Sequence, residues 1–350
     1  MRTVLFSHPT CLQHDTGPHH PECSRRVSAI TDHLIASRLA DVLVFADAPE
    51  VTREQLLRVH GGDYIDRIET QMPAQGHVSL DPDTIISPGS LAAARRAAGA
   101  AVAAVDAVMA GEADNAFCCV RPPGHHAERN RAMGFCLFNN VAVGAAHALE
   151  AHGLARVAII DFDVHHGNGT EDIFDKDDRV LFCSTFQHPF YPFTPLLDNT
   201  RSRVSVPLDA AAGSAEFRAA VTDHWLPALE RFAPEMVFVS TGFDAHVADD
   251  MSGVSLVDDD YQWVTEEIVK IAAQSASNRI VSTLEGGYEL HALARSVEER
   301  VAEPKDLCSA RRIGEDQEWD DIHLRIPEVV AVIRLPGQAL GRDAAFLDQG

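Results

Sequence analysis

Residues 157–170 read Val-Ala-Ile-Ile-Asp-Phe-Asp-Val-His-His-Gly-Asn-Gly-Thr, an apolar run that leads directly into two carboxylates and an imidazole. The apolar run is typical of a buried β-strand. Alternate side chains of an extended chain point to the same face, so we expect Asp161, Asp163 and His165 to lie together. Phe162 and Val164 then pack behind them. The stretch therefore predicts a strand that ends in a metal site.

Similar apolar runs alternate with long, Ala-rich amphipathic segments along the chain. This alternation predicts a parallel sheet covered by helices on both faces. We expect strands at residues 3–6, 116–120, 157–160, 180–183, 236–240 and 279–284, and helices at residues 90–110, 140–152, 215–232 and 258–277. The prediction is one α/β domain over residues 1–303, with a central, mostly parallel sheet flanked by helices. Residues 304–350 are expected to form a C-terminal extension whose role the sequence does not reveal.

The composition is that of an acidic globular protein, with a formal net charge of -23 and 46% hydrophobic residues. No nucleic-acid partner is expected, because phosphate backbones are bound by clustered Lys and Arg. No membrane association is expected either, since no apolar stretch approaches spanning length and the N-terminal apolar run is too short for a secretory signal. The seven cysteines are odd in number and include no Cys-x-x-Cys pair, which favours reduced thiols in a cytoplasmic protein. The sequence leaves the formation of a homo-oligomer open.

Four of the predicted strands are followed by loops that carry chemically useful side chains. These loops read Arg-Pro-Pro-Gly-His-His at 121–126, Asp-Phe-Asp-Val-His-His at 161–166, Thr-Gly-Phe-Asp-Ala-His at 241–246 and Glu-Gly-Gly-Tyr at 285–288. Open α/β sheets bind their ligands outside the carboxyl ends of their strands. We therefore expect the four loops to converge on one crevice.

The metal site is expected to use Asp163, His165 and Asp244 as its ligands. Two carboxylates and one neutral imidazole balance a divalent ion, and three protein ligands leave positions for water and substrate. Zinc is the expected metal, although oxygen and nitrogen ligands also suit Fe2+ and Co2+. Asp161 is expected to orient a histidine from outside the ligand set. His166 points away from His165 in an extended chain and is expected to be structural.

Two further loops supply groups for proton transfer and charge stabilisation. His125 and His126 follow prolines that stiffen the chain and a glycine that permits close contact, and adjacent histidines at a metal cleft predict proton transfer. Gly286 and Gly287 are a flexible pair able to swing the phenol of Tyr288 over the cleft. Beside a metal, a phenol can stabilise an oxyanion.

Seven motifs occur in order over most of the chain: His-Asp-Thr-Gly-Pro at 14–18, His-Pro-Glu at 20–22, Arg-Pro-Pro-Gly-His-His at 121–126, Gly-Phe-Cys-Leu-Phe-Asn-Asn at 134–140, Asp-Phe-Asp-Val-His-His-Gly-Asn-Gly at 161–169, Gly-Phe-Asp-Ala-His at 242–246 and Glu-Gly-Gly-Tyr at 285–288. In these motifs the chain resembles the zinc-dependent histone deacetylase family. The resemblance is to the class II-like bacterial branch, which includes deacetylase-like amidohydrolases and acetylpolyamine amidohydrolases. It implies an arginase/deacetylase-type α/β fold with zinc on Asp163, His165 and Asp244. It also implies a potassium ion held near Asp161, Asp163, His165 and Ser184.

The resemblance further implies a role for each of the remaining site residues. His126 would take a proton from the attacking water and give one to the leaving amine, while His125, paired with Asp161, would supply electrostatic support. Tyr288 and the metal would share the oxyanion. Asn168 would orient His126 where some relatives carry Asp. The residues implied to line an acyl-lysine tunnel are Gly134, Phe135 and Tyr191.

Departures from the family pattern bear on the substrate. Met251 stands where polyamine-selective members place an acidic gatekeeper, and a thioether cannot pair with a charged secondary amine. Asp249 and Asp250 lie beside it, and Phe193 and Pro195 change the loop expected at the tunnel rim. Acyl-lysine therefore ranks first as the substrate, ahead of acetylpolyamines and other small N-acyl amines.

The main expectation is a metal-dependent amidohydrolase that removes an acetyl or other short acyl group from an amine. A binuclear manganese ureohydrolase is one alternative, but it calls for an Asp-x-His-x-Asp segment and further bridging carboxylates, whereas this chain offers Asp-x-Asp-x-His and Asp244. An inactive acyl-lysine binding module is another alternative. Such a module is expected to lack Tyr288, a histidine or a metal ligand, and this chain keeps them all.

Overall fold

The computed structural model describes residues 2–302, and the expected extension at 304–350 lies outside the described residues. Across the central sheet the strands lie in the order β2 (Val44–Asp47), β1 (Thr3–Ser7), β5 (Asn115–Cys118), β10 (Ile280–Leu284), β9 (Met236–Thr241), β6 (Val157–Asp161), β7 (Val180–Gln187) and β8 (Arg203–Leu208). Every neighbouring pair is parallel. The predicted α/β domain with a central parallel sheet is confirmed. A short antiparallel hairpin, β3 (Val78–Ser79) and β4 (Ile85–Ile86), lies outside this sheet.

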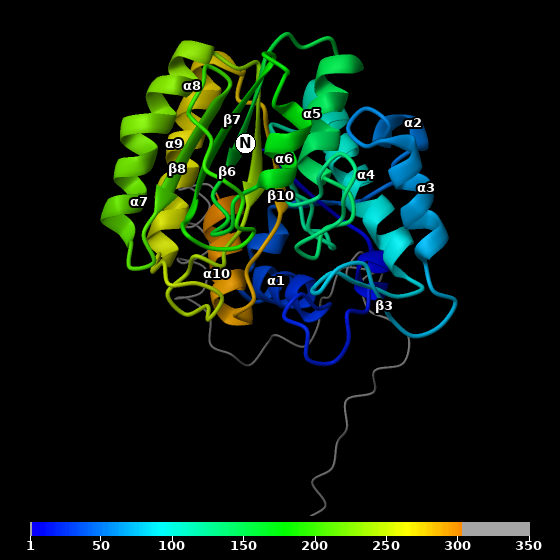
Figure 1. Ribbon diagram of the computed structural model, residues 1–350. Helices are drawn as coiled ribbons and strands as arrows, with labels where there is room; N and C mark the ends of the chain where they lie inside the picture. Colours follow the sequence, from blue (N-terminus) through cyan, green and yellow to red (C-terminus); the bar gives the residue numbers. More distant parts are fainter. Residues whose placement is uncertain (1, 303–350) are drawn as a thin grey trace, which may run out of the picture. The chain divides into compact units, whose positions relative to one another are not determined.

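Helices cover both faces of the sheet (Figure 1). One face is covered by α2 (Arg53–Leu56), α3 (Gly62–Gln71), α4 (Ser90–Met109), α5 (Asn140–Glu150) and α6 (Asn168–Phe174), and the other by α1 (Arg25–Ala36), α7 (Ser214–Ala220), α8 (Leu226–Phe232), α9 (Asp258–Ser275) and α10 (Leu290–Val301). Strand β6 explains how both cores are filled. Val157 and Ile159 belong to the core beneath α4 and α5, whereas Ala158 and Ile160 belong to the opposite core. A strand buried on both faces needs this continuous apolar run.

The helix predicted over residues 215–232 is present, but its hydrogen-bond pattern changes near its centre. The structure divides it into α7, a π-helical turn at Val221–Trp225, and α8. Pro227 lies in the first turn of α8 and lacks the backbone N–H that an unbroken α-helix would use. The wider π turn lets the chain pass this position without the missing hydrogen bond.

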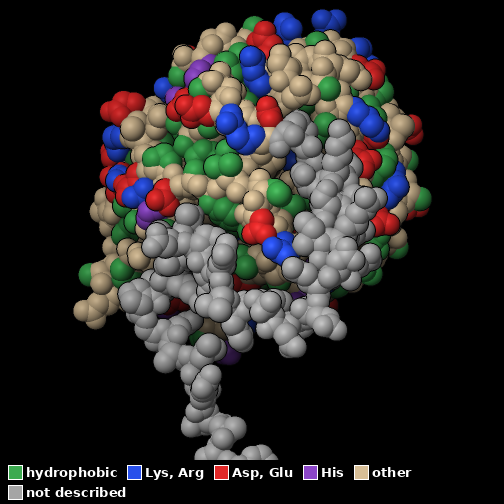
Figure 2. Space-filling model, turned by 180° about the vertical axis from the view of Figure 1, so that it is seen from behind, with side chains coloured by type: hydrophobic (Ala, Val, Ile, Leu, Met, Phe, Trp, Pro, Cys, Tyr) green, Lys and Arg blue, Asp and Glu red, His purple; other side chains and the backbone are tan. Residues whose placement is uncertain are grey.

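Three further features concern the surface, the helices and the cysteines. Figure 2 shows acidic and basic side chains interspersed on the face that it draws. No helix within residues 2–302 combines the length and the apolar character needed to cross a lipid bilayer. The six cysteines in the described part of the chain are free thiols, and five of them are buried.

Candidate active site

The four strands that carry the predicted site loops are neighbours at the centre of the sheet, in the order β5, β10, β9 and β6. Because these strands are parallel, their carboxyl ends lie at one edge of the sheet. The four loops therefore meet there, as the sequence predicted.

Asp163, His165 and Asp244 form a tight buried cluster at this edge. Their potential ligand atoms all lie within 4.8 Å of one another. Nδ1 of His165 lies 3.0 Å from Oδ1 of Asp163 and 3.1 Å from Oδ2 of Asp244. Nevertheless, the buried Oδ2 of Asp244 accepts no hydrogen bond from any described residue. An orphaned carboxylate oxygen beside a second carboxylate and an imidazole fits a divalent metal ion.

The electrostatics of the cluster also favour a cation. Burial lowers the pKa of His165, but Asp163 and Asp244 outweigh burial and raise it to about 10. Burial, together with the charge of Asp163, raises the pKa of Asp244 to about 6. Both changes report an excess of negative charge that a bound positive ion would neutralise.

The local backbone differs from the extended alternation that the sequence predicted. Strand β6 ends at Asp161, and residues 163–165 form a bend. The N–H of Asp163 donates to Oδ1 of Asp161 at 3.1 Å, and the N–H of His165 donates to Oδ1 of Asp163 at 2.9 Å. These aspartate side chains bond to the backbone two residues further on, which is typical of Asx turns. The three side chains are brought together by turns rather than by continued strand.

Two glycines let the backbone approach the ligand carboxylates. A Cβ atom on Gly242 would lie 2.1 Å from Oδ2 of Asp163, and one on Gly286 would lie 2.1 Å from Oδ2 of Asp244. The N–H of Gly286 donates to Oδ2 of Asp163 at 2.8 Å. Glycine is needed at both positions because any side chain would displace a ligand.

His125 and His126 lie side by side but have different partners. Nδ1 of His125 donates to Oδ2 of Asp161 at 3.0 Å, as predicted. Burial lowers the pKa of His125, but Asp163 and Asp161 outweigh it and raise the pKa to about 10. Burial and the positive charges of His125 and His165 hold the pKa of His126 well below its usual value. The surroundings therefore shift the pKa values of the two neighbouring imidazoles in opposite directions.

Asn168 sets the tautomer of His126. Its Oδ1 lies 2.7 Å from Nδ1 of His126, and its Nδ2 donates to Oε1 of Glu128 at 2.8 Å. The carboxylate of Glu128 can only accept, so it fixes the amide with its oxygen toward His126. Nδ1 of His126 then carries the proton and Nε2 keeps its lone pair. Sequence reasoning missed Glu128, although it lies only two residues after His126.

The backbone of the loop that carries Tyr288 is hydrogen-bonded to a buried arginine, and the predicted flexibility of the Gly286-Gly287 pair stays a prediction. Arg26 is buried and donates to the backbone oxygens of Glu285 and Gly287. Its guanidinium lies 4.9 Å from the centre of the Tyr288 ring. The ring of Tyr288 therefore packs against a positively charged residue of α1.

Glu285 connects this loop to the histidine pair. Its Oε2 accepts the N–H groups of Gly124 at 2.6 Å and His125 at 3.0 Å. Burial raises the pKa of Glu285 to about 7. The loops after β5 and β10 are thus tied together at the edge of the site.

A buried ion network supports Arg26. Arg121 binds Glu22 through two hydrogen bonds, both of 2.7 Å, and Nη1 of Arg26 lies 3.4 Å from Oε1 of Glu22. Burial raises the pKa of Glu22, but Arg121, His14 and Arg26 together outweigh burial and lower the pKa to about 2. The network gives the His-Pro-Glu and Arg-Pro-Pro motifs a structural role that their sequence alone did not reveal.

A cavity of about 220 Å³ opens beside these groups. Its lining includes the predicted tunnel residues Gly134, Phe135, Tyr191 and Met251, the predicted catalytic residues His125, His126 and Tyr288, the ligand His165, and the residues Asp83, Pro123, Phe190 and Gly286. Phe190 stacks on His165, with ring centres 5.2 Å apart. Sequence reasoning missed Phe190 and Asp83, because neither belongs to a motif that carries metal ligands.

The side chains around the predicted potassium site include an unpartnered serine oxygen. Ser184 pairs with Asp161 across β6 and β7, and its buried Oγ has no hydrogen-bond partner among the described residues. His166 contacts Thr194 at 3.1 Å and Glu171 at 3.3 Å. It is not part of the cavity lining, in keeping with the structural role expected for it.

Comparison with known proteins identifies the family. The family model described as histone deacetylase domain matches residues 20–303. The chain is 39% identical over 314 residues to the histone deacetylase-like amidohydrolase of Pseudomonas aeruginosa, covering 82% of this chain and 82% of that protein. It is 36% identical over 318 residues to the polyamine deacetylase HDAC10 of Mus musculus, covering 85% of this chain but only 47% of the mouse protein. The crystal structure of the HDA15 HD domain matches with a TM-score of 0.81 and 31% identity over 91% of both chains. The chain therefore belongs to the histone deacetylase family of deacetylases and amidohydrolases.

Proposed function

We propose that the protein is a metal-dependent hydrolase that removes an acetyl or other short acyl group from an amine, with acyl-lysine as the preferred substrate. One observation carries this proposal: His126 and Tyr288 line the same narrow cavity as His165 of the buried ligand cluster. A proton acceptor, a hydroxyl donor and a cation site thus face one space large enough for an extended side chain. This combination is what hydrolysis of an amide requires.

The metal would be held by Asp163, His165 and Asp244. When bound, zinc or a similar ion polarises a carbonyl and lowers the pKa of a water molecule toward neutrality. Fe2+ and Co2+ suit the same donor atoms. The unpartnered Oγ of Ser184 beside Asp161 supports a potassium ion near the cluster of Asp163, His165 and Asp244.

The protein's own groups would move the protons. Nε2 of His126 keeps a lone pair because Asn168 holds the proton on Nδ1, so it can accept a proton from the attacking water and return it to the leaving amine. His125 would stabilise the negative charge that develops beside it, since Asp161 favours its protonated form. The hydroxyl of Tyr288 would donate to the carbonyl oxygen as it becomes negative.

The cavity wall supports an acyl-lysine substrate over a polyamine. Met251 lines the cavity where an acidic side chain would select a charged secondary amine. Asp249 is buried, and its carboxylate accepts the N–H groups of Met251, Tyr288 and Glu289. Its charge is therefore used to hold the backbone rather than to bind substrate.

Acetylpolyamine hydrolysis is the second candidate function. The carboxylate of Asp83 lines the same cavity and offers a partner for a charged amine. The similarity to a mouse polyamine deacetylase supports the same possibility. The manganese ureohydrolase and the inactive binding module are less well supported. The family match is to the histone deacetylase domain, and His125, His126 and Tyr288 line one cavity.

The deciding experiment compares substrates on metal-reconstituted enzyme. We would strip the protein with a chelator, restore one metal at a time, and measure hydrolysis of acetyl-lysine peptides, acetylated polyamines and longer acyl-lysines. We expect metal-dependent turnover with acetyl-lysine peptides fastest, and loss of turnover in His126→Gln with the metal retained. Faster hydrolysis of acetylated polyamines would favour the second function. No hydrolysis of any acyl amine by the fully metallated protein would refute both.

A further inference from the structure

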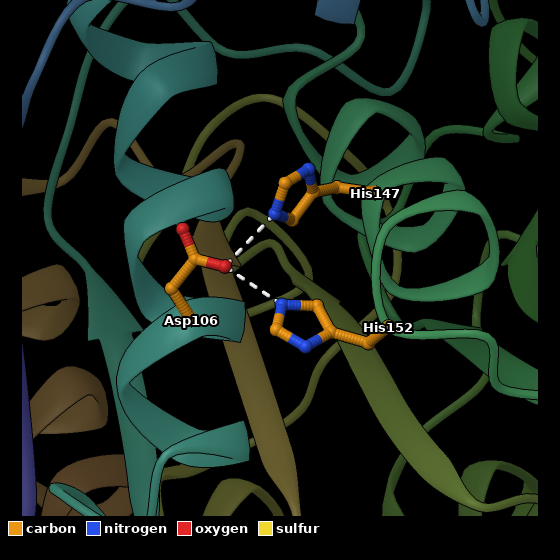
Figure 3. Close-up of side chains that lie close together, drawn as sticks. All are labelled: Asp106, His147 and His152. Carbon is orange, nitrogen blue, oxygen red and sulfur yellow. Dashed lines mark hydrogen bonds and ion pairs between the residues drawn. The ribbon is translucent and has the colours of Figure 1, made fainter.

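A second group of potential metal ligands lies between α4 and α5 (Figure 3). Nε2 of His147 lies 2.9 Å from Oδ1 of Asp106, and Nε2 of His152 lies 2.7 Å from the same oxygen. Figure 3 shows both imidazole rings turned toward this one carboxylate. The potential ligand atoms of the three residues lie within 4.8 Å of one another, as in the cluster of Asp163, His165 and Asp244.

The ends of two helices bring these side chains together. Asp106 lies in the last turn of α4 and His147 in the last turn of α5, while His152 follows just after α5 ends. Gly153 has a φ of +68°, which allows the turn that follows His152. The carboxyl end of a helix carries partial negative charge. Two such ends beside a carboxylate favour a bound cation.

One side of the cluster is buried and the other is open to solvent. The side chain of His147 is 8% exposed, that of His152 is 25% exposed, and that of Asp106 is 56% exposed. The buried histidine is held in place, while the open side leaves room for water ligands. Three protein ligands from histidine and aspartate, with positions left for water, are typical of an exchangeable zinc-type site.

We propose that Asp106, His147 and His152 form a second binding site for a divalent transition-metal ion of the zinc class. A metal ion here would link the end of α5 to α4. The site is distinct from the cluster of Asp163, His165 and Asp244. Helix α5 begins beside the catalytic loops and its 11 residues extend about 16 Å, and His152 lies just before the amino end of β6.

Arg58 opposes the ion and makes the proposal sharply testable. Its Nη1 lies 2.7 Å from Nδ1 of His147. A guanidinium can only donate, so Nδ1 of His147 accepts and its Nε2 carries the proton that bonds to Asp106. Metal binding at Nε2 therefore requires this proton to move to Nδ1 and Arg58 to swing away. His147 keeps the same number of protons, and the positively charged guanidinium of Arg58 moves away from the bound ion.

The test measures zinc bound per chain in the full-length protein. After chelation, the protein is dialysed against buffered zinc and its metal content is measured. We expect two ions per chain in the wild type, one in His152→Gln, one in Asp106→Asn, and one in Asp244→Asn, which lacks a catalytic ligand instead. Zinc should also raise the melting temperature of Asp244→Asn, because a bound ligand stabilises the native state. Arg58→Gln should bind zinc at this site about tenfold more tightly, since outer partners tune metal affinity to this extent.

His33→Gln is the matched control, because Nε2 of His33 pairs at 2.6 Å with the single carboxylate of Glu298 on a helix surface. It should keep both ions. The melting temperature of metal-free His152→Gln, compared with that of the wild type, verifies that the variant folds. The proposal is overturned if His152→Gln and Asp106→Asn bind as much zinc as the wild type, or if Arg58→Gln gains no affinity. These outcomes do not depend on the proposed hydrolase activity, because none of them is read from turnover.

Discussion

Gly286→Ala tests whether the backbone of the Tyr288 loop positions the metal ligands. The added Cβ would lie 2.1 Å from Oδ2 of Asp244 and 2.6 Å from Oδ2 of Asp163. Ordinary contact begins at 3.4 Å, so the Asp244 oxygen must retreat by the difference of 3.4 and 2.1, about 1.3 Å. A misplacement of about 1 Å in a reacting constellation costs about a hundredfold in rate. We therefore expect kcat/KM for an acetyl-lysine peptide to fall about a hundredfold or more.

Metal content and turnover of Gly286→Ala would be measured together after dialysis against limiting zinc. The variant should hold less metal at the catalytic site than the wild type. Gly213→Ala is the control, because the nearest atom to its added Cβ lies 3.7 Å away and its φ is -125°. It should retain wild-type metal content and turnover. Full metal occupancy with near-normal turnover in Gly286→Ala would refute the reasoning, because the ligands would then tolerate the clash.

Three other predictions concern the mechanism and the stability of the fold. Tyr288→Phe should lower kcat about a hundredfold or more with little change in metal content, because the variant loses only an oxyanion donor; near-normal turnover would remove the phenol from the mechanism. Asn168→Asp should lose activity, because the new carboxylate faces the carboxylate of Glu128. Adding Glu128→Gln should restore activity and shift the acid limb of the pH-rate profile to higher pH, since a carboxylate raises the pKa of His126. An acid limb at unchanged pH would mean that residue 168 does not control His126. Burial lowers the pKa of His60 from 6.5 to about 4, so on acidification this histidine is protonated in the unfolded chain before it is protonated in the folded protein. The free energy of unfolding should therefore fall by about 3 kcal/mol as the pH falls from 6.5 to 4. His60→Gln should flatten this part of the curve of unfolding free energy against pH, and an unchanged slope would contradict the assignment.

The centre of the sheet was predictable from sequence, whereas its edges were not. The predicted strands are all present, because strands buried on both faces read as continuous apolar runs. The edge strands β2 and β8 were missed. β2 is half exposed, and β8 includes Arg203 and Pro207, so neither has a continuous apolar pattern. Edge strands are short, polar or interrupted because they must avoid pairing with other chains.

The site was predictable where ligands follow central strands directly. Asp163, His165 and Asp244 are such residues, and the structure brings them together. The supports of the site were not predictable in the same way. Arg26 lies 261 residues from the carbonyl of Gly287 that it holds. Only packing in three dimensions creates such a contact, and no local pattern of residue types announces it.

The place of β10 in the sheet has a consequence for synthesis. This last strand of the described chain lies between β5 and β9, which precede it in sequence. A nascent chain that has not yet released residues 280–288 from the ribosome therefore presents two unpaired strand edges, and such edges attract other polypeptides. The same residues carry the loop with Tyr288. Productive folding must thus wait until nearly the whole domain has emerged, and we expect translation arrest before this point to yield an inactive chain that depends on chaperones.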